Sequence, residues 1–499
     1  MVAPVAPNNV DTLPAARPGR DNSCTAPFAD ARLPLCVDLD GTLTPTDLLL
    51  ESALALIKKN PLYLFLCFVW LLGGKSNLKE QIARRVTLDV DALPYNQALV
   101  SYLEQERIKG RPLYLCTAAN QRFAYQVAAH FHFFDGVLAS TASCNLSGRI
   151  KALTLVDRFG TQGFDYCGNE VKDVPIWQQA RRAIVIGGEG IAAIARRVNQ
   201  PIIFFEQERR LLRLACKEMR IYQWVKNLLI FVPLLAAHAI ADDGKLGATV
   251  LAFLSFSLCA SSVYLLNDML DLDADRHHAR KRNRPFASGQ LPLSFGLGLM
   301  AILLAAAAAL AALLPLSFIG ILAAYLVLTM VYSFRLKRLI LVDVFVLASL
   351  YTVRIVAGGA ATGIALSSWL ILFSILIFLS LAMVKRYAEL DAAVGKDEAA
   401  AGRGYVCHDM EILRSLGTAA GYLAVLVLAL YMNSPEVNVL YSRPQALWLL
   451  FVLLLYWISR MWVFAFHGKM DDDPIVFAFR DRTSLAVIGL CIGSVILAT

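Results

Sequence analysis

Charged side chains are scarce in this sequence of 499 residues. Asp, Glu, Lys and Arg make up 17% of it, hydrophobic residues make up 57%, and the mean hydropathy is +0.55. An average soluble domain has about 25% charged and about 45–50% apolar residues, so the composition argues against both a disordered chain and an ordinary cytosolic enzyme. The net charge of +8 is the difference between 47 basic and 39 acidic residues. Such a balanced excess does not indicate a nucleic-acid partner.

Paired cysteines and a targeting signal are also missing. The ten cysteines lie far apart, with no CxxC pair, so neither a zinc site nor a disulfide framework is indicated. The first 30 residues lack the basic segment followed by an apolar run that a signal peptide requires. We therefore expect residues 1–30 to form a disordered tail that stays in the cytoplasm.

Long apolar runs, in contrast, fill the chain after residue 215. Nine runs have the length of about 17–25 residues that crosses a hydrocarbon core; they lie near 221–240, 246–267, 292–314, 316–333, 339–358, 368–386, 416–432, 446–464 and 483–498. Seventeen Lys and Arg gather in the loops 268–291, 334–338, 385–415 and 460–482, which the positive-inside rule assigns to the cytoplasm. Nine spans then predict a multi-pass protein of a bacterial inner membrane with its C-terminus outside. A soluble helical bundle is the alternative.

Residues 31–215 have a different pattern. Short apolar runs at 33–39, 112–118, 183–188 and 201–205 alternate with amphipathic helical stretches, which is typical of a parallel α/β sheet. One apolar stretch, 61–74, is short for a membrane span. It is interpreted either as a buried helix of a cap or as a surface that rests on the bilayer.

Two carboxylates follow the first of these runs. Asp38 and Asp40 come at the carboxyl end of the predicted strand and precede Gly41 and Thr42, and this end of a parallel sheet is where ligands bind. One carboxylate has the chemistry to attack phosphorus while the other protonates the leaving oxygen, provided that Mg²⁺ offsets the negative charge. An ordinary strand-end turn is the alternative interpretation.

The string DxDGT resembles the first motif of the haloacid dehalogenase (HAD) superfamily of phosphatases, over about residues 32–207. The resemblance implies that Thr117 and Lys151 bind the phosphoryl group. It also implies metal ligands near residue 169, but Asn169 stands where the family has a carboxylate. The Asn169 oxygen, Glu170 or Asp173 then stay open as ligands beside Asp38 and Asp40. Residues of about 44–110 are expected to form a helical cap. A catalytically inactive, regulatory domain is the alternative.

The second acidic motif follows the second apolar run. Continued as a helix at about 100° per residue, Asp268, Asp271 and Asp275 share one face, while Asp273 points elsewhere. Three carboxylates on one face at a membrane boundary repel one another unless a cation lies among them. Mg²⁺ that also binds a diphosphate satisfies this requirement, and a solvated acidic loop is the alternative.

NDxxDxxxD after a second span resembles the UbiA superfamily of intramembrane prenyltransferases, over about residues 216–499. Finer strings, such as QWVKN at 223–227 and KRYAELD at 385–391, resemble its branch of polyprenyl-phosphate phosphoribosyltransferases. The resemblance implies that Asn267 assists the three aspartates. It implies a set of further substrate-binding residues, namely Lys226, Asn227, Lys281, Arg282, Arg284, Tyr332, Lys337, Lys385, Arg386, Glu389, Arg403 and Tyr405.

The expected architecture is a tail over 1–30, a Rossmann-like α/β HAD domain with a helical cap over 31–215, and an all-α membrane domain of the UbiA fold over 216–499. The resemblance implies a Mg²⁺-dependent enzyme that transfers phosphoribosyl from phosphoribosyl diphosphate to a polyprenyl phosphate, such as decaprenyl phosphate, in cell-envelope synthesis. The HAD domain would then remove the 5-phosphate. The alternatives are an aromatic prenyltransferase and a membrane carrier or scaffold, each with a regulatory HAD domain. The sequence does not decide whether the protein forms a homo-oligomer.

Overall fold

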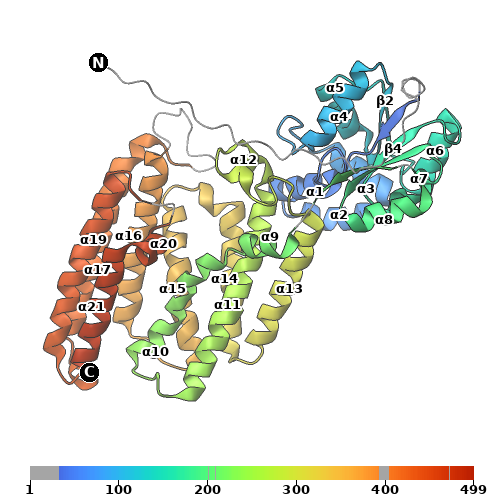
Figure 1. The fold of residues 1–499 in the computed structure, drawn as a ribbon. Helices are drawn as coiled ribbons and strands as arrows, with labels where there is room; N and C mark the ends of the chain where they lie inside the picture. The colour runs from blue at the N-terminus through green and yellow to red at the C-terminus, as the bar shows by residue number, and fades with distance from the viewer. Residues whose placement is uncertain (1–32, 201, 208–209, 393–403, 471–472) are drawn as a thin grey trace, which may run out of the picture.

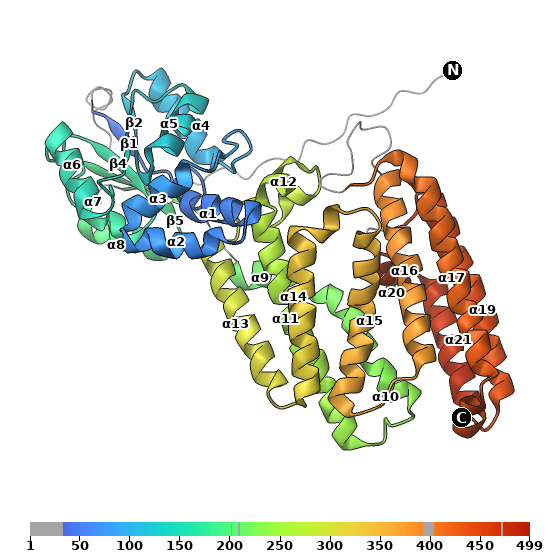
Figure 2. The ribbon, with the colours of Figure 1, turned by 180° about the vertical axis from the view of Figure 1, so that it is seen from behind.

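The computed structural model describes residues 33–200, 202–207, 210–392, 404–470 and 473–499. The predicted tail over 1–30 lies outside these residues. The chain forms a sheet domain (residues 33–206) beside a long bundle of helices, the helical domain (residues 211–499), and the two lie side by side in both views (Figures 1 and 2).

The sheet domain is built on six parallel strands in the order β3-β2-β1-β4-β5-β6. The strands are β1 (Leu35–Val37), β2 (Leu113–Asn120), β3 (Gly136–Ser140), β4 (Asp165–Gly168), β5 (Arg182–Gly187) and β6 (Ile202–Glu206). Four of them fall on the predicted apolar runs, whereas the short strands β3 and β4 were not predicted. Because β1 lies in the middle of this order, Asp38 and Asp40 follow a central strand, where ligands bind in open parallel sheets.

Helices cover both faces of this sheet. They are α1 (Leu48–Lys59), α2 (Tyr63–Leu72), α3 (Lys75–Ala83), α4 (Gln97–Ile108), α5 (Gln121–Phe131), α6 (Arg149–Phe159), α7 (Val174–Trp177) and α8 (Glu189–Val198), with a short 3₁₀ helix, η2 (Val171–Asp173). The side chains of Leu99 and Leu103 on α4 belong to the same buried core as strands β1 and β2. Leu48 of α1 and Ala83 of α3 belong to this core as well, so the predicted cap of 44–110 packs on the sheet domain. Helices α1 to α3, which lie between β1 and α4, are called the insertion.

Helix α2 corrects one interpretation of the 61–74 stretch. None of its ten residues is buried, so it is not the buried cap helix that the sequence allowed. Several of its apolar side chains, among them Phe65, Phe68 and Leu72, are exposed.

The helical domain begins with α9 (Leu211–Glu218) and an apolar segment of 3₁₀ helix η3 (Ile221–Phe231) and α10 (Val232–Ala236). The remaining helices are α11 (Asp243–Leu270), α12 (Leu272–His277), η4 (Lys281–Asn283), α13 (Leu293–Ala311), α14 (Leu316–Phe334), η5 (Leu336–Arg338), α15 (Val342–Thr362), α16 (Ser368–Asp391), η6 (Cys407–Asp409), α17 (Met410–Met432), α18 (Pro435–Leu440), η7 (Pro444–Leu447), α19 (Trp448–Phe466), α20 (Pro474–Arg480) and α21 (Arg482–Ala498).

Among the described residues, seven helices are long and apolar enough to cross a membrane, or eight if α20 and α21, bent by 84°, form one broken span. The seven are α11, α13, α14, α15, α16, α17 and the continuous stretch of η7 and α19. The nine predicted spans are therefore not confirmed. The first predicted span, 221–240, is the shorter segment of η3 and α10. Pro233 at its helical turn and buried Lys226 interrupt what reads as a continuous apolar run.

Helix α1 joins the two domains. Leu54 of α1 packs in one buried cluster with Leu265 and Met269 of α11 and Leu293 of α13. Beside this cluster Glu51 of α1 forms a buried ion pair with Arg276 of α12. The contact combines apolar burial with a paired charge, and it fixes the amino-terminal insertion against the start of the helical bundle.

The interdomain ion pair gives a first testable prediction. Arg276→Ala leaves the Glu51 carboxylate buried without its cation, which costs about 3–5 kcal/mol, so the thermal unfolding midpoint of the detergent-purified chain should fall by several degrees. Arg107→Ala is the matched control because the Arg107 and Asp135 side chains are 43% and 33% exposed and such pairs contribute about 0–1 kcal/mol. Equal midpoints for the two variants would contradict the structural role of the Glu51–Arg276 pair.

Candidate functional site

The first acidic site lies at the carboxyl end of β1. The Asp38 carboxylate accepts a hydrogen bond from the Lys151 ammonium at 2.9 Å and another from the backbone N–H of Leu39, also at 2.9 Å. Lys151 comes from the first turn of α6 and is buried. Burial alone lowers the pKa of Lys151, but Asp38 and Asp173 outweigh it and raise that pKa above its usual value. The predicted pair of Asp38 and Lys151 is thus assembled from elements far apart in the chain.

A chain of hydrogen bonds continues from Lys151 to Asp173. Lys151 also donates to the Tyr166 hydroxyl at 2.9 Å, and this hydroxyl donates to Asp173 at 3.1 Å. The other oxygen of Asp173 accepts the backbone N–H groups of Asn169 and Glu170, each at 3.0 Å. Burial raises the pKa of Asp173 to about 6, and Asp38 contributes to the rise. Asp173 therefore holds the turn after β4 in shape.

Asn169 lies directly against the loop that carries the aspartates. Its side-chain oxygen accepts a hydrogen bond from the Thr42 hydroxyl at 3.0 Å. Gly41 has a φ of +75°, and a Cβ atom there would come within 2.2 Å of the Asn169 amide nitrogen. The glycine of DxDGT is thus required both by the backbone conformation and by the close approach of Asn169. Oxygens of Asp38 and Asn169 are hard donors of the kind that Mg²⁺ prefers, so this edge fits the ion.

Asp40 has a separate environment. Its carboxylate accepts the backbone N–H of Leu48 at 3.0 Å, at the start of α1. Burial raises the pKa of Asp40 to about 8, and the charges of Asp47 and Asp38 contribute. A carboxyl group with a raised pKa is suited to donate a proton near neutral pH, which is the role of a general acid.

Two further residues complete this site. Thr117, in β2, is fully buried, and its hydroxyl accepts the backbone N–H of Ala119 at 2.9 Å. Lys79 of α3, which the sequence did not single out, donates to the Ala118 carbonyl at 2.6 Å and to the Asn145 side chain at 2.7 Å. Burial lowers the pKa of Lys79 against the opposing effect of Asp40. In the sequence, Lys79 is a lysine on a predicted helix, and nothing distinguishes it from a lysine that is exposed to solvent.

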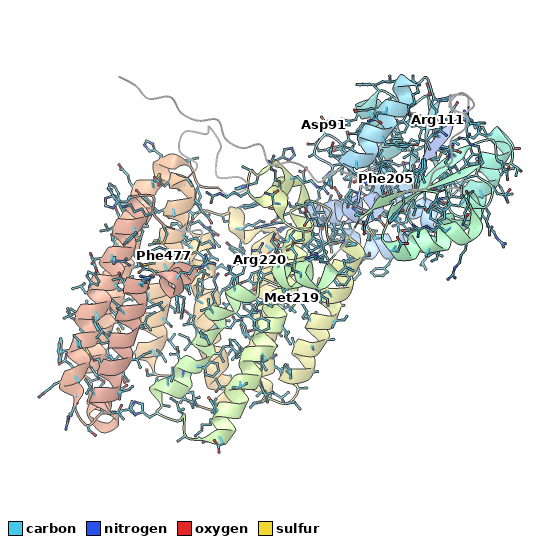
Figure 3. The ribbon with its side chains drawn as sticks, viewed as in Figure 1. Asp91, Arg111, Phe205, Met219, Arg220 and Phe477 are labelled. Atoms are coloured by element: carbon cyan, nitrogen blue, oxygen red, sulfur yellow. The ribbon has the colours of Figure 1, made fainter. Side chains whose placement is uncertain are left out.

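The second acidic site lies where α11 ends. The helical turn continues across the break at Asp271, because the N–H of Asp275 donates to the Asp271 carbonyl at 2.8 Å. Asp268 accepts two hydrogen bonds from Arg220, at 2.6 and 2.8 Å. The Arg284 guanidinium bridges Asp268 at 3.0 Å and Asp275 at 2.5 Å. Figure 3 shows Arg220 beside Met219, in the upper part of the helical domain.

Asp271 is turned toward two lysines. Lys58, from α1 of the sheet domain, lies 2.8 Å from one Asp271 oxygen, and Lys337 of η5 lies 3.4 Å from the other. Burial acts to raise the pKa of Asp271, but Lys337 and Lys58 outweigh it and hold that pKa below its usual value. Among the described residues, the oxygens of Asp268, Asp271 and Asp275 do not gather within 4.8 Å of one another. Instead, the side chains of Lys58, Arg220, Arg284 and Lys337 balance the charges of these carboxylates. Carboxylate oxygens are also the hard ligands that Mg²⁺ prefers.

Basic residues predicted to bind substrate form two further ion-pair groups. Lys226 pairs with Asp473 at the start of α20, and Lys385 lies 3.6 Å from the same carboxylate. Arg386 pairs with buried Asp343 and lies 2.5 Å from Glu389. In the second group, the Tyr332 hydroxyl donates to Asp343 at 2.7 Å and accepts from Arg386 at 2.9 Å.

The remaining predicted residues differ in their surroundings. Asn227 donates to Ser257 at 2.9 Å and accepts from Arg354 at 2.8 Å, inside the bundle. The Tyr405 hydroxyl accepts the N–H of Leu341 at 2.9 Å. Lys281 and Arg282 are exposed on η4, and Asn267 is half-buried. Arg403 lies outside the described residues.

Several ion-pair partners were missed by the sequence reasoning. Arg220 and Lys58 lie far along the chain from the carboxylates that they meet, and no local pattern predicts such pairs. Asp473 belongs to a string, Asp473-Pro474 before Asp481, that carries the family resemblance, but its pairing with Lys226 is not visible in the sequence. Asp343 offered a signal, since a carboxylate inside an apolar run is costly unless a partner neutralises it.

These features define the class of the protein, an integral membrane enzyme with an α/β domain at its N-terminus. The sequence pattern of the UbiA prenyltransferase family matches residues 230–482. The chain therefore belongs to the UbiA prenyltransferase family, as its motifs predicted.

Individual relatives extend this result. The uncharacterized protein y4nM of Sinorhizobium fredii is 35% identical over 473 residues, which cover 94% of this chain and 92% of that protein. A Mycobacterium tuberculosis protein named decaprenyl-phosphate phosphoribosyltransferase is 38% identical over 273 residues, 53% of this chain and 87% of that one. A solved HAD family hydrolase from Salmonella enterica is a structural neighbour of the N-terminal region, with 16% identity, a TM-score of 0.25, and coverage of 31% of this chain and 62% of its own.

Proposed function

We propose that the helical domain transfers phosphoribosyl from phosphoribosyl diphosphate to a polyprenyl phosphate in the membrane. The observation that carries this proposal is the ring of cations around the aspartate motif. Lys58, Arg220, Arg284 and Lys337 contact its carboxylates, and a site that joins two phosphorylated substrates needs cations for both. The similarity to the named phosphoribosyltransferase of M. tuberculosis supports the same substrates.

In the proposed reaction, a phosphate oxygen of the lipid attacks the anomeric carbon of ribose, the bond from that carbon to the diphosphate oxygen breaks, and diphosphate leaves. Asp268, Asp271 and Asp275 would hold Mg²⁺ once they exchange their present cation partners, and the ion would supply positive charge for the leaving diphosphate. Lys337 and Arg284 bind phosphate oxygens once the carboxylates have exchanged partners. No general base is required because the attacking phosphate is already ionised, so the task of these residues is positioning and charge stabilisation.

The sheet domain is proposed to hydrolyse the 5-phosphate of the lipid product. Asp38 attacks phosphorus, Asp40 protonates the departing ribose oxygen, and water then cleaves the aspartyl phosphate. Lys151 and Thr117 bind the phosphoryl oxygens, and Asp38 and Asn169 would hold Mg²⁺, which supplies positive charge between two anions. The close packing of α1 on the helical domain supports successive steps on one lipid.

We further propose that the basic loops, and with them the sheet domain, face the cytoplasm, where a water-soluble phosphoribosyl donor is supplied. The alternative of an aromatic prenyltransferase would need a second acidic motif in place of KRYAELD at 385–391. In that segment the cation Arg386 is buried, paired with Asp343 and Glu389.

Transfer is tested with membranes that contain the protein, radiolabelled phosphoribosyl diphosphate and polyprenyl phosphate. The wild-type chain should move label into the lipid fraction, and Asp268→Ala should abolish the transfer because the diphosphate loses its metal-binding carboxylate. Asp273→Ala is the matched control, because the Asp273 side chain is 77% exposed. Unlabelled lipid with the wild type, or labelling that survives Asp268→Ala, would contradict the proposal.

Coupling of the two steps is tested by Asp38→Asn in the same assay. Without its nucleophile the sheet domain cannot remove phosphate, so the variant should accumulate the lipid-linked phosphoribose, whereas the wild type converts it to the lipid-linked ribose. Chromatography of the extracted lipids with and without alkaline phosphatase separates the two species. Identical lipid profiles for the variant and the wild type would rule the coupling out.

The role of Asp40 as proton donor is tested by changing the leaving group. Asp40→Asn should lower the hydrolysis of an alkyl phosphate such as ribose 5-phosphate by about 10²–10⁴-fold, the usual contribution of a general acid. Hydrolysis of p-nitrophenyl phosphate should change far less, since nitrophenolate leaves without protonation. Equal losses on both esters would assign Asp40 a structural role instead.

A further inference from the structure

Helix α2 has an apolar outer face that no described residue of the chain covers. Its inner residues, Tyr63, Cys67 and Trp70, pack against the small core of α1 and α3. On the outer side lie Phe65, Phe68 and Leu72, exposed by 68%, 64% and 89%, together with Leu62, Leu64, Leu66, Val69 and Leu71. Residues 60–74 contain no charged side chain. Such a continuous exposed apolar face marks a binding surface for another molecule or for a membrane.

The position of α2 in the structure favours the membrane as the partner of this apolar face. Helix α1, which precedes α2, is docked on α11 and α13 through Leu54 and through the Glu51–Arg276 ion pair. Figure 2 shows α2 lying across the direction of the bundle helices, level with the upper end of α13. The outward side of α13 is itself apolar, with Ile302 exposed by 66%. The face of α2 is therefore held beside a helix that spans the bilayer.

Charges beside α2 fit an anionic lipid surface. Lys59 precedes the helix, Lys75 follows it, and the Arg85 guanidinium lies 4.7 Å from the centre of the Trp70 ring. Arg85 also lines a pocket of about 360 Å³ with Lys59, Arg84 and Arg122. An uncharged apolar helix with basic residues beside it is the pattern of segments that lie in the interfacial layer of a bilayer.

The same insertion carries a residue of the phosphatase site. After α2 the chain turns at Gly73 and Gly74, where Gly74 has a φ of +95°, and α3 brings Lys79 to the Ala118 carbonyl and the Asn145 side chain. One short segment thus connects the apolar face to the acidic edge of the sheet.

We propose that α2 is an interfacial membrane helix that seats the sheet domain on the leaflet beside α13, so that its phosphatase site acts on phosphomonoesters carried by membrane lipids. The statement about substrate rests on the proposed phosphatase activity; the statement about α2 does not. A lipid-linked substrate keeps its polyprenyl chain in the bilayer, and the domain meets the phosphorylated sugar at the surface.

The position of α2 is tested on the full chain in nanodiscs of phosphatidylcholine and phosphatidylglycerol. An environment-sensitive fluorescent side chain replaces Phe68 in one sample and Ile108 in the other. Ile108 ends α4 and is 85% exposed, and α4 lies on the side of the sheet domain away from α2 (Figures 1 and 2). Brominated acyl chains should quench the probe at 68 and leave the probe at 108 unchanged. Equal fluorescence of the probe at 68 in brominated and ordinary lipid would overturn the proposal.

The consequence for the substrate is tested with the triple variant Phe65→Glu, Phe68→Glu and Leu72→Glu, with Ile108→Glu as control. In nanodiscs the triple variant should hydrolyse a polyprenyl-linked phosphoribose at least tenfold more slowly than the wild type and hydrolyse p-nitrophenyl phosphate at the same rate. Equal rates on the lipid substrate would overturn the inference. If the wild type hydrolyses neither ester, the phosphatase activity fails, and quenching at 68 still decides the position of α2. Dimers that dissociate in the triple variant, without quenching, would assign the face to a second copy of the chain.

Discussion

Burial of carboxylates is the constraint on which both sites depend. An ionised carboxylate removed from water is costly unless a cation pairs with it. Four acids of the two motifs meet such a cation, namely Asp38, Asp268, Asp271 and Asp275. Lys151 pairs with Asp38, and Arg284 bridges Asp268 and Asp275. The Lys and Arg side chains that neutralise these buried acids are also the side chains that bind phosphate oxygens. A substrate phosphate or a metal ion can therefore enter by exchange of partners, without leaving a charge uncompensated.

Helix α1 connects the two sets of charges. At its start, the N–H of Leu48 donates to Asp40; in its middle, Glu51 pairs with Arg276; at its end, Lys58 reaches Asp271. Twelve residues at a rise of about 1.5 Å give a rigid rod of about 18 Å. The two acidic motifs are thus neighbours held by one helix. A change of partner at Asp271 would release Lys58 at the end of α1. The first turn of the same helix donates a hydrogen bond to Asp40, the proposed proton donor.

The parts of this arrangement that the sequence predicts are those with a local pattern. Asp38 was placed at a strand end because parallel strands present their carboxyl ends to ligands, and long apolar runs predicted most of the bundle. Strands β3 and β4 have no such pattern, because their sequences, GVLAS and DYCG, contain glycine and polar residues instead of a continuous apolar run. The segment 221–240 has the composition of a full span, but its 3₁₀ geometry around Lys226 is not visible in the sequence. The pair of Lys58 and Asp271 joins two domains, and no spacing rule reports a contact between such distant positions.

The joining of the two domains in one chain has a physical rationale in the bilayer. In the proposed reaction sequence, a product linked to a polyprenyl chain stays in the leaflet where it is made, so a dissolved phosphatase would have to find it at the membrane. Tethering raises the local concentration of the second site near the first without any new contact. The tether alone, however, leaves the orientation of the sheet domain free. The Glu51–Arg276 pair and the apolar cluster around Leu54 remove that freedom at one end of the insertion. The uncovered face of α2 offers a second point of attachment, and two points fix the tilt of the domain on the surface.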